Sequence, residues 1–92
     1  MKNKEKYIEI FETFGEEAQI EKLKEEVYEF ILALQTGTHK EWTEEYADVL
    51  VVMTQFFIAK GLDTMEVQLT MAAKVDRTID RIESGYYKGV AE

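Results

Sequence analysis

The chain has 92 residues, no cysteine, one histidine and a formal net charge of −8 at pH 7. The length suits one domain, the lack of cysteine excludes disulfides and thiolate metal sites, and the acidic balance disfavours nucleic-acid polymers and anionic membranes as partners. No apolar run approaches the roughly 20 residues that cross a bilayer, and no signal-peptide core follows the charged N-terminus, so we expect a soluble, cytoplasmic protein.

Four helices are predicted, because the chain contains no proline and only five glycines. They are expected over about residues 4–14, 16–35, 41–60 and 64–84. Asn3 is the expected N-cap of the first helix, and Gly15 either ends or kinks that helix. Gly37 ends the second helix, and the loop is expected to continue through His39 and Lys40. Short loops between helices favour an all-α, antiparallel four-helix bundle.

The third predicted helix is apolar on nearly all sides. Leu50 and Met53 belong to one broad apolar face, and Val49 and Val52 make the other side apolar too. A helix with this pattern is buried on nearly all sides, which a single 92-residue bundle has little room to do. We therefore expect this helix to be central and covered by a second subunit, so that oligomerisation completes the bundle.

Acidic residues recur at helical spacing on the second and third predicted helices. They are Glu25, Glu26, Glu29, Glu45 and Asp48. Spacings of three and four place the members of each group on one helix surface, so that two antiparallel helices would bring all five carboxylates together. Such a cluster repels itself unless cations occupy it, and oxygen-only ligands suit Mg²⁺ or Mn²⁺. The alternative is that these acids form ordinary solvated helix faces.

The position of Asp48 weakens that alternative, because it directly precedes the apolar run 49–53. A carboxylate that enters a buried helix is costly unless it is paired or bound to a metal ion. A divalent ion at these acids would have positions left for water and for phosphate oxygens, which favours a triphosphate substrate.

The fourth predicted helix carries a basic ridge of Lys74, Arg77 and Arg81, spaced by three and four residues. Acidic residues interleave with this ridge, so it forms either local ion pairs or a phosphate-binding surface. The sequence has no glycine-rich phosphate loop, a single serine and no cysteine. A P-loop mechanism and a nucleophilic triad are therefore disfavoured.

The acid pattern resembles a known family. Glu25-Glu26-x-x-Glu29, followed after fifteen residues by Glu45-x-x-Asp48, resembles the E-E-x-x-E…E-x-x-D signature of MazG-like proteins, in the all-alpha nucleoside triphosphate pyrophosphohydrolase superfamily. Gln19-x-x-Lys22-Leu23 is similar to a family helix at that place, and Lys74-x-x-Arg77 looks like the family's C-terminal basic element. The resemblance covers about residues 14–83 and makes residues 1–92 a single MazG-like helical domain.

The resemblance implies a homodimer or dimer of dimers that hydrolyses nucleoside or deoxynucleoside triphosphates to the monophosphate and pyrophosphate, with Mg²⁺ as cofactor. Carried over by position, the catalytic residues would be Glu25 and Glu26, the metal ligands Glu26, Glu29, Glu45 and Asp48, and the phosphate-binding residues Lys74 and Arg77. Glu25 would position the attacking water. Asp76 stands where many relatives carry Asn, and is either a ligand or an ion-pair partner.

The base site is less determined by sequence. Gln19, Lys22 and Trp42 are the candidates, with Trp42 either stacking on a base or forming a core aromatic. Two alternatives to the main hypothesis remain: a phosphoribosyl-ATP pyrophosphohydrolase-like enzyme, and a non-catalytic helical dimerisation module.

Overall fold

The computed structural model describes residues 1–88, which form four α-helices and no strand. The helices are α1 (Asn3–Phe14), α2 (Glu16–Thr36), α3 (His39–Ala59) and α4 (Thr64–Glu83). Turns follow over residues 84–88, while Gly89 lies outside the described residues. The predicted all-α class with four helices is confirmed. None of the described helices combines the length and the apolar character that a membrane span requires.

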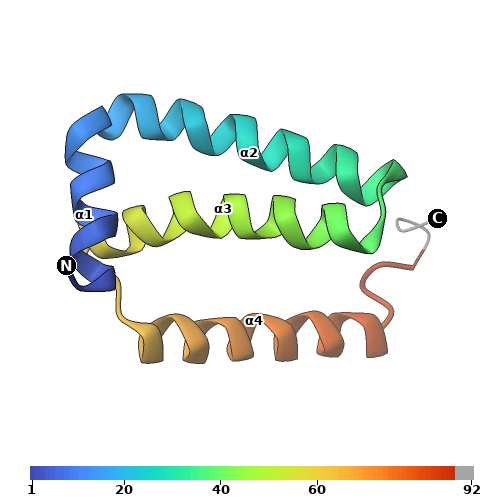
Figure 1. The fold of residues 1–92 in the computed structure, drawn as a ribbon. Helices are drawn as coiled ribbons and strands as arrows, with labels where there is room; N and C mark the ends of the chain where they lie inside the picture. Colours follow the sequence, from blue (N-terminus) through green and yellow to red (C-terminus); the bar gives the residue numbers. More distant parts are fainter. Residues whose placement is uncertain (89–92) are drawn as a thin grey trace. The chain divides into compact units, whose positions relative to one another are not determined.

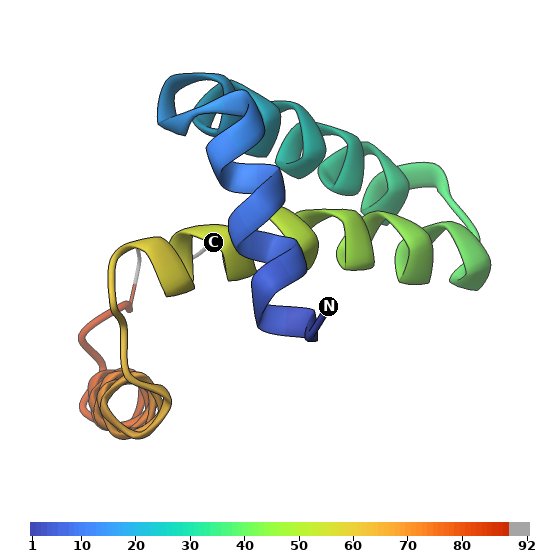
Figure 2. The ribbon, with the colours of Figure 1, turned by 60° about the vertical axis from the view of Figure 1, so that its left-hand side comes forward.

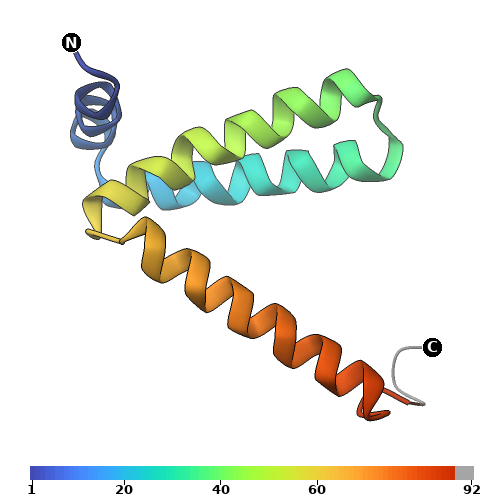
Figure 3. The same ribbon diagram turned by 90° about the horizontal axis from the view of Figure 1, so that it is seen from below.

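The chain divides into two compact units, Met1–Gly61 with α1, α2 and α3, and Leu62–Glu92 with α4. In the first unit α2 and α3 lie side by side and run in opposite directions (Figures 1 and 3). α1 crosses this pair steeply at one end (Figure 2). The ring of Phe11 on α1 packs edge-on against Phe56 on α3, with 5.2 Å between centroids. The predicted antiparallel packing is therefore present within this unit.

Contacts along α2 and α3 fix the register of the antiparallel pair. At one end Gln19 of α2 bonds Gln55 of α3. Towards the loop, Phe30 packs against Tyr46 with ring centroids 5.4 Å apart. In this register Glu26 and Glu29 of α2 face the part of α3 that carries the acids. Carboxylates that are 16 or more residues apart in sequence thus become neighbours.

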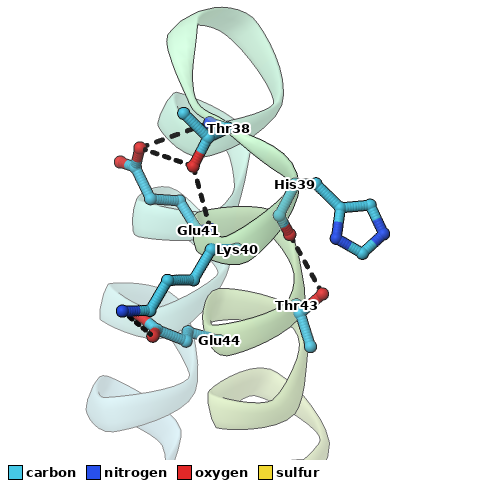
Figure 4. Close-up of polar contacts among 6 residues, drawn as sticks. All are labelled: Thr38, His39, Lys40, Glu41, Thr43 and Glu44. Atoms are coloured by element: carbon cyan, nitrogen blue, oxygen red, sulfur yellow. Dashed lines mark hydrogen bonds and ion pairs between the residues drawn. The ribbon is translucent and has the colours of Figure 1, made fainter.

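The loop between α2 and α3 is shorter than predicted. α3 begins at His39 and not after Lys40, because Thr38 caps it (Figure 4). The Thr38 Oγ1 accepts a hydrogen bond from the Glu41 backbone N–H at 3.4 Å, and the Glu41 Oε1 accepts one from the Thr38 N–H at 3.2 Å. This capping box satisfies donors at the start of the helix, so the helix extends back to His39. Only Gly37 and Thr38 connect the two helices.

Gly37 ends α2 as predicted, for a steric reason. Its N–H donates to the Ala33 carbonyl at 2.7 Å, and a Cβ at this position would lie 2.6 Å from the same oxygen. Real Cβ atoms do not approach a backbone oxygen so closely, so only glycine fits. The Trp42 indole N–H donates to this carbonyl as well, at 2.6 Å.

The end of α3, the start of α4 and the start of α1 also depend on local backbone and side-chain contacts. Gly61 follows α3 with a φ of +65°, a left-handed conformation, and Asp63 caps α4 by accepting from the Glu66 N–H at 2.9 Å. The prediction for α1 was wrong by one residue, since Asn3 is already helical and Lys2 precedes the helix. Glu5 accepts a hydrogen bond from the Lys2 N–H at 3.3 Å, and this contact starts the helix one position earlier.

Burial in α3 is confined to one face. Val49, Val52 and Gln55 are buried, whereas Leu50 and Met53 are 41% and 48% exposed. The apolar character on the opposite side of α3 thus has no cover within the unit Met1–Gly61.

Candidate functional site

Three carboxylates from α2 and α3 converge in the middle of the antiparallel pair. Glu26, Glu29 and Glu45 each offer one oxygen, and these three oxygens all lie within 4.8 Å of one another. Glu26 and Glu29 are neighbours across one helical turn, while Glu45 reaches the cluster from α3. Three of the four predicted metal ligands are therefore brought together by the fold.

Two oxygens in this cluster are buried without a hydrogen-bond partner among the described residues. They are Oε2 of Glu26 and Oε2 of Glu45. Glu26 is only 6% exposed, and its other oxygen, Oε1, lies 3.0 Å from the Nζ of Lys22. Buried carboxylate oxygens are normally paired, because leaving them unpaired is costly. A hard divalent cation with oxygen ligands, such as Mg²⁺, fits this donor set.

The electrostatics of the cluster point the same way. Burial raises the pKa of the Glu45 carboxyl, and the negative charges of Glu29, Asp48 and Glu26 raise it further. The pKa of Lys22 is raised in turn, first by its hydrogen bond and charge interaction with Glu26. The neighbouring acids contribute to both shifts, and a bound dication would neutralise their negative charge.

Asp48 and Glu25 lie beside the cluster and not within the group of three oxygens. Both are exposed, and both line a groove that Glu26 also lines. Asp48 is close enough for its charge to raise the pKa of Glu45. The predicted fourth ligand thus sits at the edge of the acidic cluster, on the groove side.

The groove next to the acids encloses about 700 Å³ between α1, α2 and α3. Its apolar walls include Ile10 and Phe14 from α1 and Val52 from α3. Gln19 and Lys22, two of the predicted base-binding residues, line it as well. The groove therefore combines apolar walls, side-chain amides and carboxylates in one space.

Gln55 is a groove residue that sequence reasoning missed. It is 2% exposed, and its Oε1 accepts a hydrogen bond from the Gln19 Nε2 at 2.9 Å. Its own Nε2 donates to the Val51 carbonyl at 3.2 Å. A signal was available, because Gln55 follows Val49 and Val52 at helical spacing and is the polar member of that otherwise apolar face.

Trp42 lies elsewhere in the same unit. It lines a second, more open groove with Phe30 and Tyr46, and its indole N–H is used by the Ala33 carbonyl. Within one chain the fold does not bring Trp42 to Gln19 and Lys22. Its contacts are those of a residue that holds the α2–α3 loop in place.

Lys74 and Arg77 belong to α4, and so to the second unit of the chain. Both are exposed on α4, and neither forms a salt bridge with an acidic residue of its own unit among residues 62–88. The neighbouring Asp76 is exposed too. On the same helix Arg81 stacks over the Tyr86 ring at 4.9 Å. The local ion pairing that was one interpretation of this ridge is thus not formed by Lys74 or Arg77 among the described residues.

Carboxylates that converge from two antiparallel helices, beside a groove with amide and apolar walls, define an all-α protein with a site suited to a divalent metal. The chain belongs to the MazG nucleotide pyrophosphohydrolase domain family, whose family model matches residues 14–82. The resemblance expected over residues 14–83 is thereby confirmed. No curated protein and no solved structure matches the chain. The family implies a nucleotide as the ligand, and the acidic cluster lies inside the matched segment.

Proposed function

We propose that the chain is a Mg²⁺-dependent pyrophosphohydrolase that converts nucleoside or deoxynucleoside triphosphates and water into the monophosphate and pyrophosphate. The observation that supports this is the convergence of Glu26, Glu29 and Glu45, with two buried oxygens left unpaired among residues 1–88. A structural acid cluster would be expected to pair these oxygens, whereas a metal site leaves them free for the ion.

In this proposal Glu26, Glu29 and Glu45 hold the metal ion, and Asp48 joins them from the groove side. A bound Mg²⁺ would supply charge neutralisation at the phosphate oxygens and at the leaving pyrophosphate. Lys22 forms the ion pair with Glu26 at 3.0 Å, so its cation is at hand for a phosphate when a metal takes over that carboxylate.

Glu25 and Glu26 are the proposed catalytic residues. Glu25 is exposed and lines the groove next to Glu26, where water has access. Its carboxylate can accept a hydrogen bond from the attacking water and orient it towards the anhydride between the α- and β-phosphates. Glu26 links this step to the metal, since it lines the groove and belongs to the acidic cluster.

The groove is the proposed site of the nucleoside. Phe14 and Val52 offer apolar walls to a base, and Gln19 and Lys22 offer hydrogen-bond partners. Trp42 takes part in base binding only if an assembly brings it to a groove, because one chain uses its indole at the loop.

The phosphate-binding role of Lys74 and Arg77 is part of the same proposal. Both are exposed cations on α4 without a salt bridge to residues 62–88 of their own unit. They are therefore available to bind phosphate oxygens that the metal ion does not contact.

A homodimer or dimer of dimers in the cytoplasm completes the proposal. The exposed residues Leu50 and Met53 on α3 offer an apolar surface that a second copy would cover. An obligate helical dimer of this kind buries such surface as a domain core does.

A pyrophosphate-release screen tests the proposal. The purified chain is incubated with the common ribo- and deoxynucleoside triphosphates and with phosphoribosyl-ATP, with Mg²⁺ and with EDTA. We expect Mg²⁺-dependent pyrophosphate release from one or more triphosphates. Release from phosphoribosyl-ATP alone would reassign the substrate, and no release from any compound would favour the dimerisation module.

A further inference from the structure

Two side-chain amides form an ordered chain at the inner wall of the groove. Gln55 donates from Nε2 to the Val51 carbonyl at 3.2 Å and accepts at Oε1 from the Nε2 of Gln19 at 2.9 Å. Gln55 and Gln19 are 2% and 6% exposed. A backbone carbonyl can only accept a hydrogen bond, so the Gln55 Nε2 faces Val51 and the Gln55 Oε1 faces Gln19. The Gln55 Oε1 in turn requires the Gln19 amide to present its Nε2.

This arrangement leaves part of the Gln19 amide unused. One Nε2 hydrogen goes to Gln55, and no hydrogen bond within residues 1–88 occupies the second hydrogen or the Oε1. Gln19 lines the groove beside the acids. Gln19 therefore has one donor hydrogen and one acceptor oxygen left for a ligand in the groove.

We propose that Gln55 is a positioning residue that locks the Gln19 amide, and that the locked amide lets the groove discriminate amino-bearing from oxo-bearing nucleobases. This inference rests on the proposed function, because it takes a nucleotide as the ligand of the groove. It goes beyond that function by naming the residue pair that sets base preference.

The fixed orientation of the Gln19 amide matters because nucleobases differ in the order of their donor and acceptor groups. Cytosine and adenine carry an amino donor next to a ring-nitrogen acceptor, whereas uracil and hypoxanthine carry a carbonyl acceptor next to a ring N–H donor. A freely rotating amide could pair with either order. A locked amide pairs with one order and opposes donor to donor and acceptor to acceptor in the other, which leaves buried polar groups unpaired.

A purely structural role for the pair predicts something different. Two buried amides that only satisfy each other would affect the free energy of unfolding, and would treat all bases alike. Gln19 lines a groove of about 700 Å³, which is space for a ligand and not a packed core. The discriminating readout is therefore the ratio of affinities for two bases of equal size.

The experiment measures binding of the α,β-imido analogues of dCTP and dUTP to the full chain with Mg²⁺, by titration calorimetry. We expect the wild type to favour one analogue by roughly 10- to 100-fold, the range for one bidentate pair. Gln55→Leu should bring the two affinities to within about 3-fold, because the Gln19 amide can then turn to suit either base. Gln19→Leu should have the same effect, and the double variant should show no further change.

A matched variant keeps the test interpretable. Gln35→Leu makes the same chemical change at an exposed position of α2 and should keep the wild-type ratio. Gln19→Leu supplies the answer if Gln55→Leu fails to fold.

Equal affinities of the wild type for the two analogues, or an unchanged ratio in both Leu variants, would overturn the inference. Its failure is separable from that of the proposed function. Selective binding without pyrophosphate release would contradict the proposed hydrolase activity and support the role of the two glutamines. Pyrophosphate release with equal affinities for the two analogues would support the activity and contradict the role of the glutamines.

Discussion

The two halves of the α2–α3 pair differ in whether their polar side chains have hydrogen-bond partners. Near the loop, the Thr38 hydroxyl, the Glu41 carboxylate and the Trp42 indole all have partners within three residues or across the loop. In the middle of the pair, Glu26 and Glu45 each bury an oxygen that has no partner among residues 1–88. Both halves are built from the same two helices.

This difference distinguishes polar groups that stabilise the fold from polar groups that bind a ligand. A polar group that serves the fold is satisfied by the fold, because an unsatisfied buried group lowers stability. Groups left unsatisfied at a defined place are explained by a ligand that the chain itself does not supply. On this ground the acids of the middle region, and not those of the loop, are expected to control activity.

The largest expected effect is on catalysis by the acidic cluster. Glu29→Gln or Glu45→Gln removes one charged oxygen of the group of three and should lower kcat/KM for pyrophosphate release by roughly 100-fold or more. Steady-state assays with saturating Mg²⁺ measure this. Glu44→Gln is the matched control, since Glu44 lies next to Glu45 in sequence, is exposed and forms a salt bridge with Lys40 at 3.9 Å. Equal losses at Glu44 and Glu45 would contradict the separation.

The second effect is on stability, at the loop. Gly37→Ala places a Cβ 2.6 Å from the Ala33 carbonyl oxygen and should lower the free energy of unfolding by about 1–3 kcal/mol, as overpacking does. Urea denaturation provides the measurement. Gln35→Ala, at an exposed neighbouring position, should change stability by less than about 0.5 kcal/mol. A fully stable Gly37→Ala variant would show that the loop geometry is wrong.

A third change sharpens the comparison, because it should affect stability alone. Thr38→Ala removes the N-cap of α3 and is expected to cost about 1 kcal/mol. Thr38→Ser keeps the hydroxyl and should retain most of that stability. Neither variant should alter kcat/KM, because the loop is outside the acidic cluster. Loss of activity in a folded Thr38→Ala variant would mean that the two halves are coupled.

The smallest expected effect concerns pH. The pKa of Glu45 is raised in the folded chain, first by burial and then by neighbouring acids, from an ordinary value of 4.5. The folded state therefore holds this proton to higher pH than the unfolded state. Stability from this group is complete below its ordinary pKa and is lost as pH rises through the raised value.

Thermal unfolding of the EDTA-treated protein between pH 4.5 and 7 measures this loss. We expect the Tm of the wild type to fall more steeply with rising pH than that of Glu45→Gln, which has no proton to lose there. Added Mg²⁺ should raise the Tm of the wild type at pH 7, since binding to the folded state stabilises it. Parallel pH profiles of the two proteins would count against the raised pKa.

Much of the fold was predictable, because helix ends depend on local chemistry. Gly37, Gly61 and Asp63 each end or start a helix through their own backbone freedom or side-chain acceptor. Two helix starts were predicted wrongly: Asn3 was expected to be the N-cap of α1, and His39 was expected to lie in the loop before α3. In both helices, a glutamate three residues after the N-cap residue accepts a hydrogen bond from the backbone N–H of that residue. Such reciprocal bonds depend on side-chain rotamers as well as on residue type.

The site was predictable where one helical period places its members together. Glu26 and Glu29 share a face by spacing alone, and an antiparallel partner then brings Glu45. Gln55 could be identified only by noticing a polar residue on a buried face. The use of the Trp42 indole could not be foreseen, because it depends on how closely two helices approach at the loop.

The two-residue link between α2 and α3 has a consequence for the evolution and engineering of the chain. If the link keeps its geometry, each inserted residue is taken up by α3, which turns the helix by about 100° and advances it by about 1.5 Å relative to α2. Glu45 would then leave the face that meets Glu26 and Glu29, while every helix could still form. Deletions and insertions at this point should therefore be selected against more strongly than substitutions, although the link itself lies outside the acidic cluster.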